Sequence, residues 1–182
     1  MTQPRLSVVI ASTRPHRIGH HVADWVTSQV PDGFDLTVHD LREWAFPLLD
    51  EPEQPSTGIY THEKTRAWSE AIRATDALVL VMPEYNRGYN AALKNAIDYL
   101  YAEWEGLPVG CVGYGWYGAS YAKEALRQTL ERVKMTVVDG PGLVFEKTLG
   151  QDGEVRAGAE DETALAAMFA ELDASARTPL DR

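Results

Sequence analysis

Residues 77–82, with the sequence ALVLVM, decide the fold, and the polar sequence PEYN follows them at 83–86. Six consecutive apolar residues predict a strand that is buried on both faces, because a half-exposed strand would alternate apolar and polar side chains. Pro83 is expected to end this strand. A strand buried in this way needs helices on both sides of its sheet, so the stretch favours an α/β fold with a parallel sheet.

The same pattern continues on both sides of this strand. Short runs rich in Val and Ile predict further strands, and the longer amphipathic stretches between them predict helices. We expect strands at 6–11, 34–40, 108–113 and 136–145 (the last in two pieces), helices at 19–29, 63–74, 91–101, 119–133 and 159–176, and a proline-rich loop at 46–58. Strands that alternate with helices predict right-handed crossovers and a doubly wound parallel sheet in three layers, α/β/α. No repeat or linker divides the sequence, so residues 1–182 are expected to form one domain.

Composition narrows the function classes. The chain has 182 residues and a net charge of −10, which argues against nucleic-acid binding because that affinity depends on neutralising phosphates. No apolar stretch is long enough to cross a bilayer, and the N-terminal apolar segment is too short for a signal peptide, so we expect a cytoplasmic protein without membrane contact. The single cysteine, Cys111, excludes an internal disulfide and is expected to be a small buried residue. The histidines lack the spacing of metal ligands, so no metal site is expected.

The loop after the first strand is rich in groups that bind anions. In a parallel α/β sheet, ligands bind at the carboxyl ends of the strands. Residues 12–19 (STRPHRIG) combine two hydroxyls, two guanidinium groups and a helix N-terminus, and residues 1–23 contain no acidic side chain. Helix N-termini and arginine forks both favour phosphate, so an anion site is predicted here. The alternative is a capped turn with solvated arginines. The loop lacks the G-x-x-x-x-G-K-[ST] arrangement, which argues against a nucleoside triphosphatase.

The loop after the strand at 77–82 contains polar groups beside an aromatic ring. Glu84, Tyr85 and Asn86 supply donors, acceptors and an aromatic face that suit the edge of a planar heterocycle. A Pro-x-x-Asn sequence after a strand is equally compatible with a simple turn.

A third loop, GYGWYG at 113–118, matches G-x-G-x-x-G between a strand and a helix. The dinucleotide fingerprint belongs after the first strand, whereas this loop follows the fourth. We therefore interpret the glycines as allowing close approach of the backbone to a flat ligand, flanked by Tyr114, Trp116 or Tyr117. The alternative is a flexible turn whose aromatic residues point outward. Ala119 stands where a phosphate-binding loop would have lysine.

Together, these segments resemble the NADPH-dependent FMN reductase family, which includes quinone, azo-dye and chromate reductases. The most specific part is PEYN at 83–86 joined to LKNAIDYL at 93–100, and looser matches lie at 9–19 and 113–119. The resemblance covers roughly residues 5 to 145. It implies a flavodoxin-like fold with strand order 2-1-3-4-5, FMN as the cofactor, and NADPH or NADH as the electron donor.

By this resemblance, the first loop would hold the FMN phosphate, the second would line the isoalloxazine ring, and the third would close its pyrimidine side. The cofactor-binding residues implied are Ser12, Arg14, Arg17, Ile18, Gly19, Pro83, Glu84, Tyr85, Asn86, Gly113, Tyr114, Gly115 and Trp116. Ala11, His16 and Ala119 stand where the family often has glycine, and Asn90 replaces a frequent proline.

The implied activity is reduction of quinones, free flavins or similar small acceptors by a ping-pong cycle in which the flavin carries the chemistry and no protein nucleophile is needed. Two other functions stay open. One is a flavin-binding redox sensor or electron carrier without turnover. The other is an NAD(P)-binding dehydrogenase domain that would use Gly113, Gly115 and Gly118.

The helix expected at 91–101 is apolar over much of its surface, more than contact with one sheet requires. We therefore expect a homodimer, or a homotetramer, since the family commonly forms both.

Overall fold

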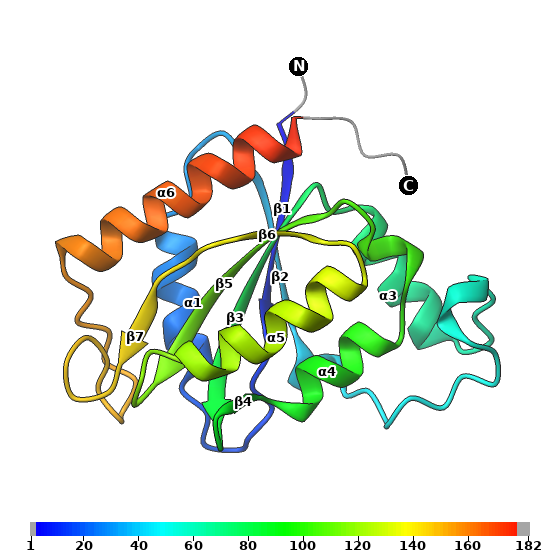
Figure 1. Cartoon of the computed structure of the whole chain (residues 1–182), viewed down its shortest axis with the longest axis horizontal. Helices are drawn as coiled ribbons and strands as arrows, with labels where there is room; N and C mark the ends of the chain where they lie inside the picture. The colour runs from blue at the N-terminus through cyan, green and yellow to red at the C-terminus, as the bar shows by residue number, and fades with distance from the viewer. Residues whose placement is uncertain (1–2, 178–182) are drawn as a thin grey trace.

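The computed structural model describes residues 3–177, whose strands form one largely parallel sheet between two layers of helices (Figure 1). The strands are β1 (Arg5–Ile10), β2 (Asp35–Asp40), β3 (Ala77–Tyr85), β4 (Gly88–Tyr89), β5 (Pro108–Gly115), β6 (Thr136–Val138) and β7 (Gly142–Val144). The sheet order is β2-β1-β3-β5-β6, with β7 also paired to β5 and β4 paired to β3. When the hairpin strand β4 is left out and β6 and β7 are counted as one strand, this order is the expected 2-1-3-4-5. The last expected strand is divided into two pieces, β6 and β7, as the sequence predicted.

All five expected helices are present. They are α1 (Gly19–Ser28), α3 (Glu63–Arg73), α4 (Ala91–Asp98), α5 (Ser120–Arg132) and α6 (Ala159–Ala176). One face of the sheet is covered by α1 and α6, and the other by α3, α4 and α5 (Figure 1). Across residues 3–177, no helix combines the length and the apolar character that a bilayer crossing requires.

Besides the two-residue strand β4, three short helical elements escape sequence analysis: the helix α2 (Leu41–Trp44) and the 3-10 turns Pro55–Thr57 and Ala102–Trp104. Each is a single turn, so none of them is long enough to give a detectable hydrophobic period.

The uniformly apolar sequence of β3 follows from burial on both faces. Leu78, Leu80 and Met82 pack into the core under α3, α4 and α5, whereas Val79 and Val81 pack into the core under α1 and α6. All five are at most 2% exposed. Each such side chain contributes about 1.5–3 kcal/mol when it is removed from water. β3 is therefore the strand on which both helical layers assemble.

The expectation that Pro83 ends this strand is wrong. Pro83 still pairs with Tyr114 in the parallel ladder, and β3 continues to Tyr85, where it turns back antiparallel into β4. Asn86 and Arg87 form this two-residue turn with φ values of 53° and 63°. Left-handed conformation at both central residues is typical of the hairpin turn whose twist matches its strands. Hairpin pairing extends the strand past the proline.

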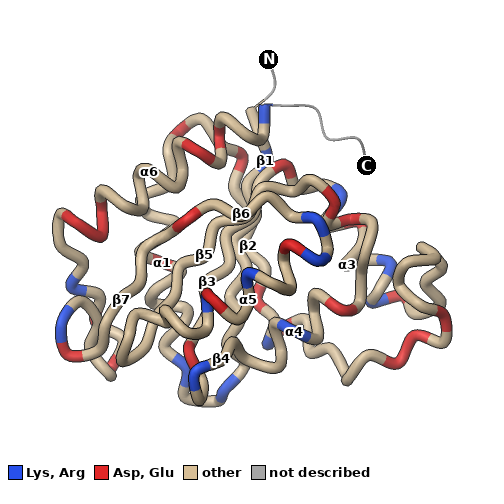
Figure 2. The backbone as a smooth tube through the Cα atoms, in the orientation of Figure 1, with Lys and Arg blue, Asp and Glu red and all other residues tan. Residues whose placement is uncertain are grey.

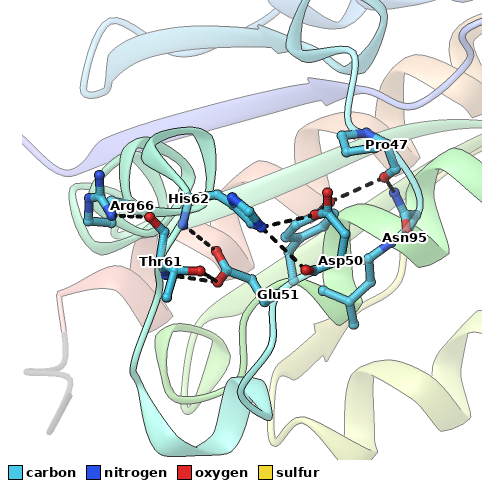
Figure 3. A network of polar contacts seen from close by, with 9 residues as sticks. Pro47, Asp50, Glu51, Thr61, His62, Arg66 and Asn95 are labelled. Carbon is cyan, nitrogen blue, oxygen red and sulfur yellow. Dashed lines mark hydrogen bonds and ion pairs between the residues drawn. The ribbon is translucent and has the colours of Figure 1, made fainter.

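A network of polar contacts orders the long segment 45–62 that joins α2 to α3 (Figure 3). Glu51 accepts hydrogen bonds from the N–H and hydroxyl of Thr61, at 2.8 and 2.7 Å, and from the N–H of His62 at 3.0 Å. The side-chain amide of Asn95, on α4, donates to the carbonyl of Pro47 at 2.6 Å and accepts from the N–H of Leu49 at 3.0 Å. These hydrogen bonds thus fix both ends of the segment, whose only regular element is the 3-10 turn Pro55–Thr57.

We predict that Glu51→Gln lowers the free energy of unfolding at pH 7 by about 1–2 kcal/mol, because hydrogen bonds to a charged acceptor are lost at a partly exposed site. Burial opposes ionisation of Glu51, but hydrogen bonds to the carboxylate outweigh it and lower its pKa from 4.5 to about 2. A lowered pKa in the folded state gives stability that is complete above the unfolded value and is lost as the pH falls towards about 2.

Urea unfolding at several pH values measures this effect. The difference between the wild type and Glu51→Gln should be constant above pH 5 and shrink below it. Glu53→Gln, at an exposed position of the same segment, is the matched control and should leave stability unchanged. A difference between wild type and Glu51→Gln that does not vary with pH would contradict this role of the carboxylate.

Candidate functional site

The loops after β1, β3 and β5 meet at one edge of the sheet, where they surround a cavity of about 300 Å³. Its walls contain nine of the residues implied by the resemblance, together with three others. The lining residues are Ser12, Arg14, His16, Arg17, Ile18, Pro83, Glu84, Tyr85, Tyr114, Trp116, Phe145 and Gln151. Parallel pairing of β1 with β3 and of β3 with β5 explains why these loops come together.

The first loop presents unpaired backbone donors. Within residues 3–177, the N–H groups of Thr13, Arg14 and residues 16–19 donate to no backbone acceptor. They precede or begin α1, whose first turn contains no acidic side chain. Arg14 is exposed, has no carboxylate partner in this part of the chain, and lies with its guanidinium carbon 5.9 Å from the centre of the Tyr85 ring. These N–H groups, the helix N-terminus and one uncommitted guanidinium form a site suited to an anion.

Arg17 occupies a different environment from Arg14. Its guanidinium forms a two-bond ion pair with Asp40, at the end of β2, and also donates to the carbonyl of Ser12 at 2.7 Å. The hydrogen bond to Asp40 raises the pKa of Arg17. Burial opposes ionisation of Asp40, but the hydrogen bond from Arg17 and that from the Arg42 N–H lower its pKa overall. Arg17 therefore holds the first loop against β2 with its charge largely neutralised.

Two tyrosines close the inner wall of the cavity. The hydroxyl of Tyr85 lies 2.9 Å from the hydroxyl of Ser12. Tyr114 is buried, and its hydroxyl would lie only 2.6 Å from a Cβ placed on Gly19. Glycine at position 19 is therefore required for this packing. Burial raises the pKa of Tyr114, so its phenol stays protonated and can donate a hydrogen bond.

Glu84 has a structural role that the sequence does not reveal. Its carboxylate accepts the N–H of Ala122 at 3.1 Å, in the first turn of α5. The residue before α5 is Ala119, which has φ 58° and makes no side-chain cap. Glu84 thus stabilises the start of α5 from β3 while it also lines the cavity. Asn86 lies in the turn to β4 and is not among the lining residues.

The glycine-rich loop is shaped chiefly by packing within the protein. A Cβ on Gly113 would lie 2.5 Å from the Cβ of Ala119, and a Cβ on Gly118 would lie 2.8 Å from the carbonyl oxygen of Gly142 on β7. Gly118 also has φ 60°, which favours glycine. Tyr114 and Trp116 line the cavity. The predicted glycines Gly19, Gly113 and Gly115 do not.

Asn90, which stands where the family often has proline, makes a buried hydrogen bond that proline could not make. Its side-chain amide donates to the carbonyl of Ala11 at 2.7 Å, and the residue is 4% exposed. The amide oxygen has no partner within residues 3–177. Asn90 immediately precedes α4, so this hydrogen bond connects the start of α4 to the loop after β1.

Three lining residues were not predicted to bind the cofactor. His16 belongs to the first loop, whereas Phe145 and Gln151 follow β7. No motif marks positions 145 and 151, because they reach the cavity only through the pairing of β7 with β5. Phe145 and Gln151 could have been predicted only if the place of β7 in the sheet had been known.

A second, larger cavity of about 800 Å³ lies beside the segment 45–62 and shares no lining residue with the first. Trp44, Pro47 and Tyr99 form its apolar wall, and Asp50 and His62 form part of its polar wall. Of these two cavities, only the smaller one is lined by the residues of the first loop with uncommitted N–H groups, namely Arg14, His16, Arg17 and Ile18, so it is the better candidate for a phosphate ligand.

Metal and thiol chemistry have no site in the described part of the chain. Among residues 3–177, no group of three His, Cys, Asp or Glu side chains could hold a metal ion. Cys111 is buried on β5 as expected, and burial raises the pKa of its thiol to about 12.

Comparison with known proteins gives a consistent picture. Residues 4–150 match the model of a family described as NADPH-dependent FMN reductase. An NAD(P)H-dependent FMN reductase of Schizosaccharomyces pombe is 39% identical over 138 residues, covering 74% of this chain and 69% of that protein. A quinone reductase of Pseudomonas putida is 30% identical over 143 residues, covering 75% and 74%.

Among solved structures, two-electron reduced flavodoxin from Megasphaera elsdenii superposes with a TM-score of 0.55 at 14% identity, covering 91% of this chain and 98% of that one. This likeness shows a flavodoxin-like fold, in agreement with the sheet order. The family match extends over most of the chain and contains all three loops of the cavity, so the chain belongs to the NADPH-dependent FMN reductase family.

Proposed function

We propose that this chain is an FMN-dependent NAD(P)H oxidoreductase that reduces quinones, free flavins or similar small acceptors. The observation that carries the proposal is the run of uncommitted N–H groups at the loop after β1, next to Arg14 and the start of α1. Such a run binds a phosphate dianion. Membership of the FMN reductase family and the named activities of its relatives support the same assignment.

The residues of the cavity fit FMN. Ser12, Arg14 and the N–H groups of Ile18 and Gly19 would bind the phosphate, and Arg17 would hold their loop in place through Asp40. Pro83, Glu84 and Tyr85 would line one side of the ring system, with Asn86 close by in the hairpin turn.

Tyr114 and Trp116 would also line the ring system, on backbone shaped by Gly113 and Gly115. When bound, FMN supplies the chemistry of accepting a hydride from NADPH or NADH and passing electrons to an acceptor. The protein would bind and orient the ring.

We predict that Arg14→Gln weakens FMN binding about 10- to 100-fold, because a charged hydrogen bond to the phosphate is lost. Riboflavin has the same ring without the phosphate, and its affinity should not change. Fluorescence titration of the apoprotein with each flavin gives both dissociation constants. Arg42→Gln, an exposed arginine near the same loop, is the matched control. Equal affinity of the wild type for FMN and riboflavin would falsify the phosphate site.

We predict that the FMN-loaded protein oxidises NADPH in the presence of 1,4-benzoquinone much faster than the same concentration of free FMN does. Initial rates at several concentrations of both substrates should give parallel double-reciprocal lines, because donor and acceptor would use the same open side of the ring in turn. If the protein binds FMN but adds nothing to the rate of free FMN, the alternative of a flavin-binding sensor or carrier replaces the enzyme. A colourless protein that binds NADPH would favour the dehydrogenase alternative.

We also propose that the chain assembles as a homodimer or homotetramer, although not for the reason given by the sequence. Leu93, Ala96, Ile97 and Leu100, which suggested a surplus apolar face, are at most 2% exposed within the chain's own core. The support comes from the ordered segment 45–62 instead. It leaves Leu48 82% exposed and Ile59 57% exposed. Apolar side chains held out on a fixed segment are typical of an interaction surface.

We predict that Leu48→Lys shifts the assembly towards the monomer, because a charge replaces an apolar contact. Light scattering at several protein concentrations measures the mass. Val38→Lys is the matched control, since Val38 is 47% exposed on the edge strand β2, outside this segment. A monomeric wild type, or equal dissociation by both variants, would rule out this surface.

The remaining assignments stay proposals. We propose one FMN-binding domain for residues 1–182, of which 1–2 and 178–182 lie outside the described residues. A cytoplasmic location is consistent with NAD(P)H as donor and with a single cysteine, which is unpaired and buried.

A further inference from the structure

Arg87 is an exposed cation in the hairpin turn that follows the cavity-lining end of β3, and it is not itself a lining residue. It lies in the turn between β3 and β4, two residues after Tyr85, which lines the cavity. Its guanidinium carbon is 4.7 Å from the centre of the Tyr121 ring, a cation–π distance. No carboxylate within residues 3–177 forms an ion pair with it. Its charge is therefore oriented by an aromatic face and is not neutralised.

The aromatic rings beside Arg87 are unusually exposed. Trp116 and Tyr117 are each 59% exposed and Tyr121 is 38% exposed, and they are the large aromatic side chains that stand exposed in the described residues. Tyr117 packs edge-to-face on Tyr121, with ring centres 5.6 Å apart. Trp116 packs in the same way on Phe145, at 5.4 Å. We call Arg87, Trp116, Tyr117 and Tyr121 the aromatic rim.

The aromatic rim is continuous with the candidate site. Trp116 and Phe145 line the cavity, and Tyr117 directly follows Trp116 in the glycine-rich loop. Glu84 connects the two sides of the rim, because it precedes the hairpin turn on β3 and its carboxylate accepts the N–H of Ala122 beside Tyr121. The rim therefore extends from Trp116 in the cavity wall along the glycine-rich loop to Tyr121 and Arg87.

The distribution of charge favours an anion here. The protein has a net charge of −10, which repels anions in general. Figure 2 shows basic positions at the end of the molecule where β4 and the loop after β1 lie, and acidic positions along α6. The basic positions at this end favour an anionic ligand there over the acidic surface of α6.

We propose that the aromatic rim binds planar electron acceptors that carry a negative charge next to the ring, such as sulfonated or carboxylated quinones, and thereby selects them over neutral ones. The exposed rings would stack on the acceptor, and the Arg87 fork would bind its sulfonate or carboxylate in a bidentate manner. A neutral quinone would gain only the stacking. This inference rests on the proposed reductase function and names the acceptor class of that same site.

The test compares 1,4-naphthoquinone-2-sulfonate with 1,4-naphthoquinone, which share one ring system. Arg87→Gln should lower kcat/KM for the sulfonate about fivefold, the effect of one exposed charge pair, and change kcat/KM for the neutral quinone less than twofold. Arg87→Lys should restore part of the preference, because the charge remains without the fork. The preference of the wild type should also decrease as salt is added.

Arg132→Gln is the matched control. Arg132 lies at the other end of α5 from Tyr121 and is also placed over a tyrosine, 5.9 Å from the Tyr101 ring centre, but neither Arg132 nor Tyr101 belongs to the aromatic rim. This variant should keep the wild-type preference. An equal loss of preference in both variants would mean that the net charge of the protein decides, and would overturn the role of the rim.

Binding without turnover separates this inference from the proposed function. Anthraquinone-2-sulfonate added to the protein without NADPH should quench tryptophan fluorescence, with a dissociation constant about fivefold higher in Arg87→Gln. If the wild type reduces neither quinone but still shows this binding difference, the proposed activity fails and the anion site stands. If both quinones are reduced and Arg87→Gln changes neither rate nor binding, the anion site fails alone. A change confined to the KM for NADPH would assign Arg87 to the donor and would also overturn the proposal.

Discussion

Burial of β3 on both faces is the constraint on which the rest of the structure depends. Its side chains alternate between two cores, so helices must cover both sides of the sheet, and crossovers of one hand then keep β1, β3 and β5 parallel. Parallel neighbours end at the same edge. The three loops that form the cavity are brought together by this requirement and not by contacts among themselves.

At that edge, some charged side chains are paired within the protein, whereas others are available to a ligand. Arg17 is neutralised by Asp40 and fixes the loop, whereas Arg14 and the N–H groups around it have no acceptor in the described part of the chain. The same division recurs across the cavity, where the carboxylate of Glu84 is used to start α5 while Arg87 keeps its charge exposed. An acidic protein can attract an anion locally only where some of its cationic groups are not neutralised by its own carboxylates.

Much of the fold could be predicted from the sequence, because β3, the crossover helices and the broken last strand all have clear hydrophobic patterns. The errors have local causes. Pro83 is compatible with a strand here because a hairpin follows it, and the apolar residues of α4 are used inside the chain. The loops of the site were recognised from their composition. The pairing of Arg17 with Asp40 and the partners of Glu84 and Asn90 were not, because these contacts join residues at least 23 positions apart in the sequence that are brought close only by the sheet or by a helix start.

Two asparagines connect α4 to separate parts of the molecule. Asn90, just before the first residue of the helix, donates to the carbonyl of Ala11 in the loop after β1. Asn95, within the helix, holds Pro47 and Leu49 in the segment 45–62. The loop of the candidate phosphate site and the segment that exposes Leu48 and Ile59 are therefore anchored to the same short helix.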